Sequence, residues 1–333
     1  MTTQPITQEI LTVENVNISF KKSKTQSVLA VKDLSFQIRQ DETVALVGES
    51  GCGKSVTALS LMQLVEKNSS IIEGNILFEG ENLNKLTEKE MQAVRGNKIS
   101  MIFQEPMTSL NPVHKIGKQI SEVLVLHGFA TKADSKDKAI EILKKVGIPR
   151  ADSIINEYPH QLSGGMRQRV MIAIAMACNP KLLIADEPTT ALDVTIQAQI
   201  LELMKTLQQQ FNTAILLITH DLGVVSEMAD RVIVMYYGQI VEQAPVRTLL
   251  KNPKHPYTIG LLNSVPDINS DSDEPLSPIE GNVPNIGEIK EGCPFRLRCK
   301  QVHAKCHTEN PALFQLDQQF VRCWLYEKRE VGA

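Results

Sequence analysis

The sequence has no long apolar run, no strong excess of charge of either sign and no internal repeat. No stretch of its 333 residues approaches the ~20 consecutive apolar residues that span a bilayer. The first residues, Met1 to Glu14, lack the basic and then apolar pattern of a signal peptide. Lysine and arginine number 35 against 38 acidic residues, a net charge of -3, so overall charge does not indicate nucleic-acid binding. We expect a cytosolic protein, for which any membrane role would come through a partner.

A glycine-rich loop follows an apolar run in the first part of the chain. The run Thr43–Val47 is rich in β-branched residues and predicts a buried parallel strand. The next eight residues fit the pattern G-x4-G-K-S, and apolar residues at helical spacing over Val56–Val65 predict the helix that this motif requires. Lys54 would reach the β- and γ-phosphates of a nucleotide, and Ser55 would ligate Mg²⁺. The predicted phosphate-binding residues are Gly48, Glu49, Ser50, Gly51, Cys52, Gly53, Lys54 and Ser55.

A second apolar strand pattern, Lys181–Glu187, ends in two acidic residues. It predicts that Asp186 lies at the carboxyl edge of the sheet, where phosphate and Mg²⁺ bind, so that it can hold the coordination shell of the metal. Glu187 would then polarise the water that attacks the γ-phosphate. A solvated acidic strand end is the structural alternative for this pair.

A second glycine signal, Leu162–Met166, precedes the apolar helical stretch Val170–Met176. Ser163, Gly164 and Gly165 would open that helix. Their unpaired N–H groups and the helix dipole predict a further anion site.

Together these motifs resemble the nucleotide-binding subunit of an ATP-binding-cassette (ABC) machine. In that family two subunits close around two ATP molecules, and Ser163–Gly165 would bind the γ-phosphate held by the other subunit. Pro188–Asp193 is similar to the family's D-loop. The resemblance implies that Gln104 contacts Mg²⁺ and the attacking water, that His220 contacts the γ-phosphate, and that Phe20 stacks on adenine. By itself, a histidine after a strand is more often structural, and Phe20 could equally be a core residue.

The predicted fold is α/β, a P-loop ABC ATPase core with an antiparallel β subdomain, a helical subdomain and a small C-terminal metal-binding extension. Residues 8–250 would form the nucleotide-binding domain, with the helical subdomain at about 101–165. Residues 251–333 would form the extension and include a segment rich in Asp, Ser and Pro at 267–278, which predicts a linker or exposed loop. No second cassette is visible, so the chain would supply half of an ATPase dimer.

Four of the six cysteines lie in the extension, at Cys293, Cys299, Cys306 and Cys323. A reducing cytosol argues against disulfides, and four thiolates so close in sequence could surround one metal centre. The segment Gly292–Cys299 resembles the C-terminal motif of oligopeptide and dipeptide importer ATPases, whose cysteines hold a 4Fe–4S cluster. The spacing has no CxxC pair of the kind usual in zinc ribbons. Zinc, with His303 or His307 replacing a cysteine, and unliganded thiols are the alternatives.

Two further stretches, Gln104–Pro112 and His255–Leu262, are similar to the same importer group. The resemblance implies an ATP- and Mg²⁺-dependent ATPase at the cytoplasmic face of the cell membrane that powers di- or oligopeptide import. Its partners would be a second ATPase subunit in a heterodimer, two transmembrane permeases and an extracytoplasmic peptide-binding protein, with no nucleic acid. An importer of nickel or another solute, a soluble ABC ATPase of DNA repair or translation, and a metal-binding scaffold with a decayed ATPase are the alternatives.

Overall fold

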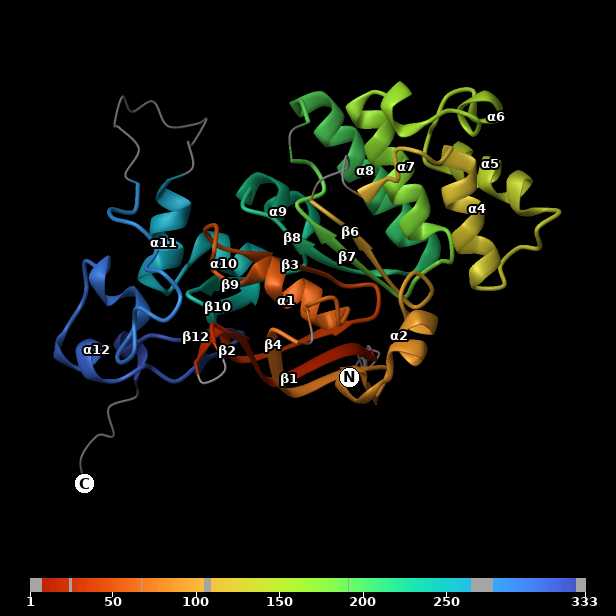
Figure 1. Ribbon diagram of the computed structural model, residues 1–333. Coiled ribbons are helices and arrows are strands. Elements are labelled where there is room, and N and C mark those ends of the chain that lie inside the picture. The colour runs from red at the N-terminus through yellow and green to blue at the C-terminus, as the bar shows by residue number, and fades with distance from the viewer. Residues whose placement is uncertain are drawn as a thin grey trace, which may run out of the picture. The chain divides into compact units, whose positions relative to one another are not determined.

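The computed structural model describes residues 8–23, 26–66, 68–104, 109–190, 192–264 and 278–327. The chain forms two compact units whose segments alternate along the sequence (Figure 1). Unit 1 contains residues 1–11, 37–43 and 77–218, and unit 2 contains residues 12–36, 44–76 and 219–333. Three predicted features fall partly or wholly outside the described residues. They are residues 267–277 of the expected linker, Glu105–Thr108 of the importer-like segment and Ala191 of the D-loop-like segment.

Unit 1 is built on parallel strands in the order β8 (Ala214–Ile218), β7 (Leu182–Asp186) and β6 (Ile99–Ile102). Their register places Ile184 beside both Met101 and Leu216. Every residue of β7 and β8 is buried, and β7 confirms the strand that the apolar run Lys181–Glu187 predicts. Asp186 is the last residue of β7, as expected for a residue at the carboxyl edge of the sheet.

The helices of unit 1 lie mostly between β6 and β8 in the sequence. They are α2 (Glu88–Val94), α4 (Ile116–Leu126), α5 (Ser135–Lys145), α6 (Ala151–Ile154), α7 (Gly164–Met176) and α8 (Val194–Phe211). Helix α4 packs against α5 and α7, and α7 also packs against α8 and β6. The apolar stretch Val170–Met176 is thus helical, as predicted, and most of its residues are buried.

Unit 2 contains strands in the order β11 (Phe314–Leu316), β12 (Gln319–Val321), β10 (Gln239–Pro245), β9 (Arg231–Tyr236) and β3 (Thr43–Val47). β3 and β9 are parallel, whereas β9, β10, β12 and β11 pair in antiparallel fashion. The helices are α1 (Lys54–Leu61), α9 (Leu222–Met228), α10 (Val246–Lys251), α11 (Pro256–Asn263) and α12 (Ala304–Thr308). Tyr236, Tyr257 and Phe295 form an aromatic cluster in this core, with ring centroids 4.7 to 5.4 Å apart.

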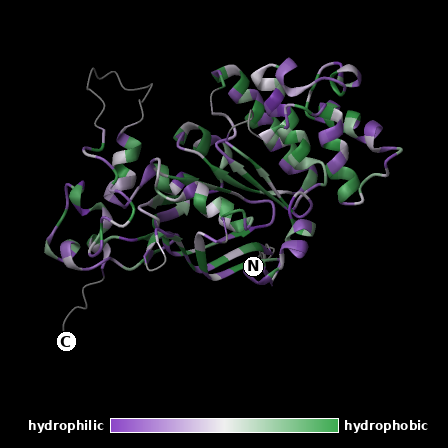
Figure 2. Cartoon of the chain, in the orientation of Figure 1, coloured by the Kyte–Doolittle hydropathy of each residue, from purple (hydrophilic) through white to green (hydrophobic). Residues whose placement is uncertain are grey.

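A second sheet has the strand order β2 (Ser27–Arg39), β1 (Glu9–Lys21), β4 (Ser70–Phe78) and β5 (Glu81–Asn82). β1 and β2 form an antiparallel hairpin, because the Lys22 N–H donates to the Gln26 carbonyl at one end and the Gln40 N–H to the Gln8 carbonyl at the other. Figure 2 shows hydrophobic residues along β7 and β8, in keeping with their complete burial.

Helix α1 is shorter than the sequence pattern predicts, since it ends at Leu61 instead of continuing to Val65. Gln63 adopts a left-handed conformation with φ 47°, which no α-helix continues through. Leu64 is consequently 41% exposed rather than part of a buried helical face. Within the described ranges, no helix combines the length and hydropathy needed to cross a bilayer.

Candidate functional site

The glycine-rich loop of unit 2 connects β3 to α1. A Cβ on Gly48 would lie 2.3 Å from the carbonyl oxygen of Met235 in β9 and 2.7 Å from the Cys52 sulfur, so no larger residue fits there. Gly53 is the N-cap residue of α1 and has φ 105°, a conformation that glycine adopts without strain. The loop therefore leads directly from a buried strand into a helix N-terminus, the geometry that binds phosphate through backbone N–H groups.

Lys54 is folded back onto this loop. Its Nζ donates to the carbonyl oxygens of Gly48 at 2.7 Å and Glu49 at 3.0 Å, and its side chain is buried. Cys52 is buried beside it, and burial raises the pKa of that thiol, so the sulfur stays protonated at neutral pH. The lysine ammonium thus lies inside the loop, bound to two of its backbone carbonyls.

Glu187 of unit 1 is held by contacts on its side chain and its backbone. Its Oε2 accepts hydrogen bonds from Gln104 Nε2 and from Thr190 Oγ1, each 2.9 Å long. Its N–H donates to the carbonyl of Ile218 at 2.9 Å, and its backbone has φ 47°. The structure therefore brings together two residues that the sequence places 83 positions apart, a glutamine and the acid after β7.

The second glycine signal forms the N-terminus of α7 in unit 1. Ser163 is the N-cap residue, and its Oγ accepts a hydrogen bond from the Met166 N–H at 3.3 Å. Gly164 and Gly165 form the first turn, and a Cβ on Gly165 would lie 2.9 Å from Ile196 Cγ2 in α8. The predicted helix start is confirmed, and the second glycine permits close contact with α8.

Two further predicted site residues lie in unit 2. His220 is exposed between β8 and α9, and the next residue, Asp221, caps α9 by accepting from the N–H groups of Gly223 and Val224. Phe20 is half-buried near the end of β1. The functions assigned to both residues remain predictions.

The four C-terminal cysteines come together in unit 2. All are free thiols, and the backbone N–H of Cys293 donates to the carbonyl of Cys306 at 2.8 Å. Burial, with smaller contributions from the neighbouring thiols of Cys306, Cys323 and Cys299, raises the pKa of Cys293 to about 12. Burial likewise raises the pKa of Cys323 to about 11, with added effects of Cys299 and Cys306. Four thiols are thus close enough to influence one another.

This cysteine group is not arranged as a finished metal site. Across the part of the chain that the structure describes, no three His, Cys, Asp or Glu side chains have the arrangement of metal ligands. The donor set nevertheless suits a soft metal, and Cys299 Sγ already accepts a hydrogen bond from the Gln301 N–H at 3.4 Å. Such N–H···S contacts are among the interactions that tune iron–sulfur clusters. The residues fit a metal centre in chemistry, although not yet in geometry.

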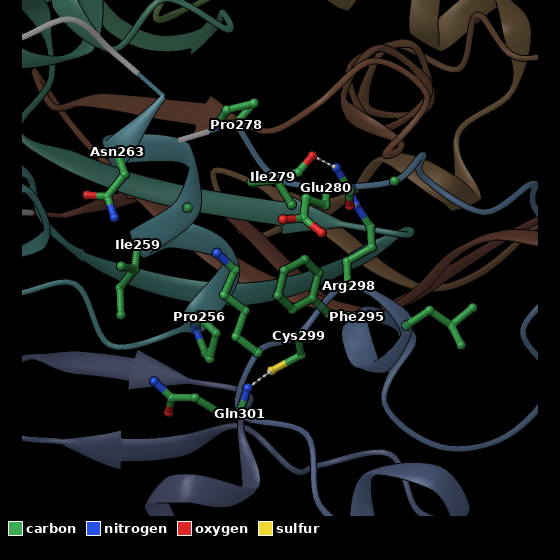
Figure 3. Close-up of a pocket in the computed structure, with 14 residues that line it drawn as sticks. Pro256, Ile259, Asn263, Pro278, Ile279, Glu280, Phe295, Arg298, Cys299 and Gln301 are labelled. Atoms are coloured by element: carbon green, nitrogen blue, oxygen red, sulfur yellow. Dashed lines mark hydrogen bonds between the residues drawn. The ribbon is translucent and has the colours of Figure 1, made fainter. Parts of the chain in front are cut away.

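A pocket of about 520 Å³ lies beside Cys299 (Figure 3). Pro256 and Ile259 of α11 line it on one side, and Arg298 and Gln301 line it from the cysteine-bearing loop. Arg298 belongs to the segment that the sequence singles out for its cysteines, but the pattern contains no signal for the contacts of that arginine.

Comparison with known proteins places these features in one family. Residues 31–190 match the family described as ABC transporter, and residues 241–306 match the oligopeptide/dipeptide transporter C-terminal region. The oligopeptide transport ATP-binding protein AppD of Bacillus subtilis (strain 168) is 56% identical over 97% of this chain and 98% of its own length. The dipeptide transport ATP-binding protein DppD of Lactococcus lactis subsp. cremoris (strain MG1363) is 49% identical over 97% and 92%, respectively.

A solved structure agrees with the sequence comparison. The ATP-binding cassette MJ0796, in a dimeric post-hydrolysis state bound to ADP and Pi, has a TM-score of 0.63 and 28% sequence identity. The match covers 71% of this chain and 99% of that chain. The loop at Gly48–Ser55, the acids that end β7 and the glycines that open α7 thus lie within a cassette fold. The chain therefore belongs to the ATP-hydrolysing, ATP-binding proteins of ABC transporters, in the group with the oligopeptide/dipeptide transporter C-terminal region.

Proposed function

We propose that this chain hydrolyses ATP to power the import of di- or oligopeptides through partner permeases. The observation that carries the proposal is similarity over nearly the whole length, including the cysteine-bearing C-terminal region, to relatives named oligopeptide and dipeptide transport ATP-binding proteins. The match of the C-terminal region favours peptide cargo over nickel, because a cassette match alone would fit either.

In the proposed site, the loop Gly48–Ser55 binds the phosphates of ATP. Lys54 exchanges its contacts with the Gly48 and Glu49 carbonyls for the β- and γ-phosphates, since its ammonium already lies inside the loop. Ser55 and Gln104 contact Mg²⁺, whose shell Asp186 also holds. Phe20 stacks on the adenine ring.

Glu187 is proposed to orient the attacking water, with His220 contacting the γ-phosphate. The hydrogen bonds from Gln104 and Thr190 fix the Glu187 carboxylate, which is what a water-positioning group requires. Ser163, Gly164 and Gly165 at the start of α7 would bind the γ-phosphate held by a second ATPase subunit. ATP would then hold the two subunits together, and hydrolysis would release them.

The proposed assembly contains a second, related ATPase in a heterodimer, two transmembrane permeases and an extracytoplasmic peptide-binding protein. The chain would act at the cytoplasmic face of the membrane. Residues 8–250 would form the ATPase domain, whose helical part near 101–165 passes movement to the permeases. Residues 251–333 would form the extension.

The test compares ATP turnover and peptide uptake by the reconstituted transporter with and without Glu187→Gln. Turnover should fall by about 10²- to 10⁴-fold, the usual effect of losing a general base, while ATP binding persists and the closed dimer accumulates. Glu202→Gln, an exposed acid in α8, is the matched control and should turn over like the wild type. Brisk turnover by Glu187→Gln would remove that residue from catalysis. Uptake of nickel without uptake of peptides would overturn the assigned cargo.

We also propose that Cys293, Cys299, Cys306 and Cys323 hold a 4Fe–4S cluster with a structural role, with one zinc as the competing occupant. The support is the set of four free thiols, of which Cys306 is buried and the other three are half-buried, and the N–H···S contact at Cys299. Metal binding would deprotonate these thiols, although burial raises the pKa of Cys293, Cys299 and Cys323. Protein purified without oxygen should be brown and contain about four irons per chain. Colourless protein with one zinc would contradict the cluster, and metal-free protein would contradict both.

A further inference from the structure

The P-loop residue Glu49 is bound on three sides. Its carbonyl accepts from Lys54 within the loop, but its other contacts come from residues far along the chain. Its N–H donates to Tyr257 Oη at 2.8 Å. Its carboxylate receives both terminal nitrogens of Arg298, with Nη1 at 2.7 Å from Oε2 and Nη2 at 2.9 Å from Oε1. Residues of the C-terminal part of unit 2 thus bind the second residue of the phosphate-binding loop.

Arg298 is itself held in place. Its Nε donates to the Glu280 carbonyl at 2.9 Å and its Nη2 to the Ile279 carbonyl at 3.2 Å (Figure 3). The guanidinium carbon lies 5.9 Å from the centre of the Tyr236 ring, and only 4% of the side chain is exposed. A planar guanidinium bound in this way forms a bidentate pair at little further cost in side-chain entropy.

Tyr257 is fixed as firmly. It is fully buried, and its ring contacts Tyr236 at 4.7 Å and Phe295 at 5.4 Å between centroids. Phe295 and Arg298 belong to the same short segment between Cys293 and Cys299. One segment of the extension therefore supports both contacts to Glu49, directly through Arg298 and through the packing of Tyr257.

The charge of Glu49 gives this contact a functional meaning. Its carboxylate belongs to the loop whose N–H groups receive the triphosphate, and an uncompensated negative charge there would repel ATP. Arg298 supplies the compensating charge from a nearly buried position, where water and salt screen it less than on the surface.

We propose that Arg298 is a positioning residue of the nucleotide site, which neutralises Glu49 and holds the phosphate-binding loop in the conformation that accepts ATP. This inference rests on the proposed function, in that the loop Gly48–Ser55 binds ATP. Within that function, it makes the segment between Cys293 and Cys299 part of the nucleotide site rather than an appendage of the cassette.

A double-mutant cycle on the full chain tests the proposal, with MgATP affinity measured by calorimetry. Arg298→Gln should weaken binding by about tenfold at low salt, the effect expected when a charged hydrogen-bonded pair is broken and one charge is left unpaired. The loss should shrink in 0.5 M salt, because a freed carboxylate acts through its charge. Glu49→Gln removes the carboxylate charge and is the reference background of the cycle. In that background Arg298→Gln should weaken binding by less than about twofold, because no charge remains to neutralise.

Arg322→Gln is the matched control. Arg322 also precedes a cysteine, is also nearly buried, and pairs its Nη2 with Asp33 Oδ2 at 3.0 Å, but Asp33 lies in β2 rather than in the phosphate-binding loop. Its loss should change ATP affinity by less than about twofold. Equal losses in Arg298→Gln and Arg322→Gln, or an undiminished loss in the Glu49→Gln background, would overturn the proposal in favour of a general folding role.

Two further variants distinguish a failure of the positioning role from a folding defect and from a failure of the proposed function. Arg298→Lys keeps the charge and should lose less than about threefold in affinity, so it serves where Arg298→Gln does not fold; a tenfold loss there would contradict charge neutralisation. Lys54→Ala should abolish ATP binding. If the wild type does not bind ATP, or Lys54→Ala binds it equally well, the proposed function fails. If Lys54→Ala abolishes binding but Arg298→Gln binds normally, only the positioning role fails.

Discussion

Acidification should destabilise unit 2 through a single buried histidine. His255 is 2% exposed at the N-cap of α11, where its Nδ1 accepts a hydrogen bond from the Tyr257 N–H at 3.0 Å. Burial lowers the pKa of His255 to about 3, so the ring is neutral in the folded protein. In the unfolded chain the same side chain titrates near pH ~6.5. Between these values the unfolded state binds the extra proton, so stability is retained above pH ~6.5 and lost progressively as the pH falls below it.

The size of this effect depends on how far the pH lies below the pKa of His255 in the unfolded chain. At pH 5 the titration of His255 should lower the free energy of unfolding by about 2 kcal/mol relative to pH 7.5, since each pKa unit corresponds to about 1.4 kcal/mol. The carboxylate of Glu242 accepts a hydrogen bond from the backbone N–H of His255 at 2.8 Å, and burial raises the pKa of Glu242. Acidification therefore changes the Glu242 contribution to stability in the opposite direction from that of His255. A variant that keeps Glu242 but removes the histidine isolates the His255 contribution.

The measurement is urea unfolding of the wild type and His255→Asn at pH 7.5 and pH 5, followed by Trp324 fluorescence. Asparagine retains the ability to cap the helix and does not titrate. The sole tryptophan lies in the same unit, with its Nε1 bonded to the Glu309 carbonyl, and reports on unfolding there. The wild type should lose about 2 kcal/mol more than the variant on acidification. Equal losses in the two proteins would refute the assignment of a neutral buried histidine.

Glycine substitutions make two further predictions. Gly48→Ala should reduce MgATP affinity at least tenfold and lower the melting temperature, because its Cβ would meet the Met235 carbonyl at 2.3 Å and backbone cannot yield cheaply. At Gly51 a Cβ meets no atom within 4 Å, so Gly51→Ala should lower the free energy of unfolding by only about 1 kcal/mol, the cost of its left-handed conformation. Equal losses of melting temperature in the two variants would contradict the steric argument. Gly117→Ala should destabilise unit 1 by about 1–3 kcal/mol in thermal unfolding, because its Cβ would lie 2.8 Å from the Ile155 carbonyl oxygen, and a wild-type melting curve would disprove that close approach.

Local patterns predicted the elements of the site because strands, glycine turns and helix caps depend on neighbouring residues. The strand before Gly48, the acid that ends β7 and the helix start at Ser163–Gly165 follow from a few adjacent positions. The early end of α1 did not follow, because the left-handed turn at Gln63 does not alter the apolar periodicity. The cysteine group was predicted from composition and resemblance, but ligand geometry depends on how the extension packs.

The contacts of Glu49 could not be predicted from the sequence. Tyr257 and Arg298 lie 208 and 249 residues away from it, and nothing in either local pattern indicates a partner in the phosphate-binding loop. Because Arg298 directly precedes Cys299, the sequence pattern assigns it to the cysteine motif. Long-range pairings of this kind depend on which surfaces the fold brings together, which periodicity and turn chemistry do not specify.

The backbone conformation of Glu187 opposes thermal stability to the water-positioning role proposed for its side chain. A left-handed conformation costs a side-chain-bearing residue about 1 kcal/mol, and glycine or asparagine tolerates it better. A laboratory selection for thermostable variants of this chain would therefore favour glycine or asparagine at position 187, and each would remove the carboxylate that Gln104 and Thr190 hold. Directed evolution of such a transporter would need to screen for turnover alongside heat resistance, because a stabilising substitution at this position would remove the carboxylate proposed to orient water.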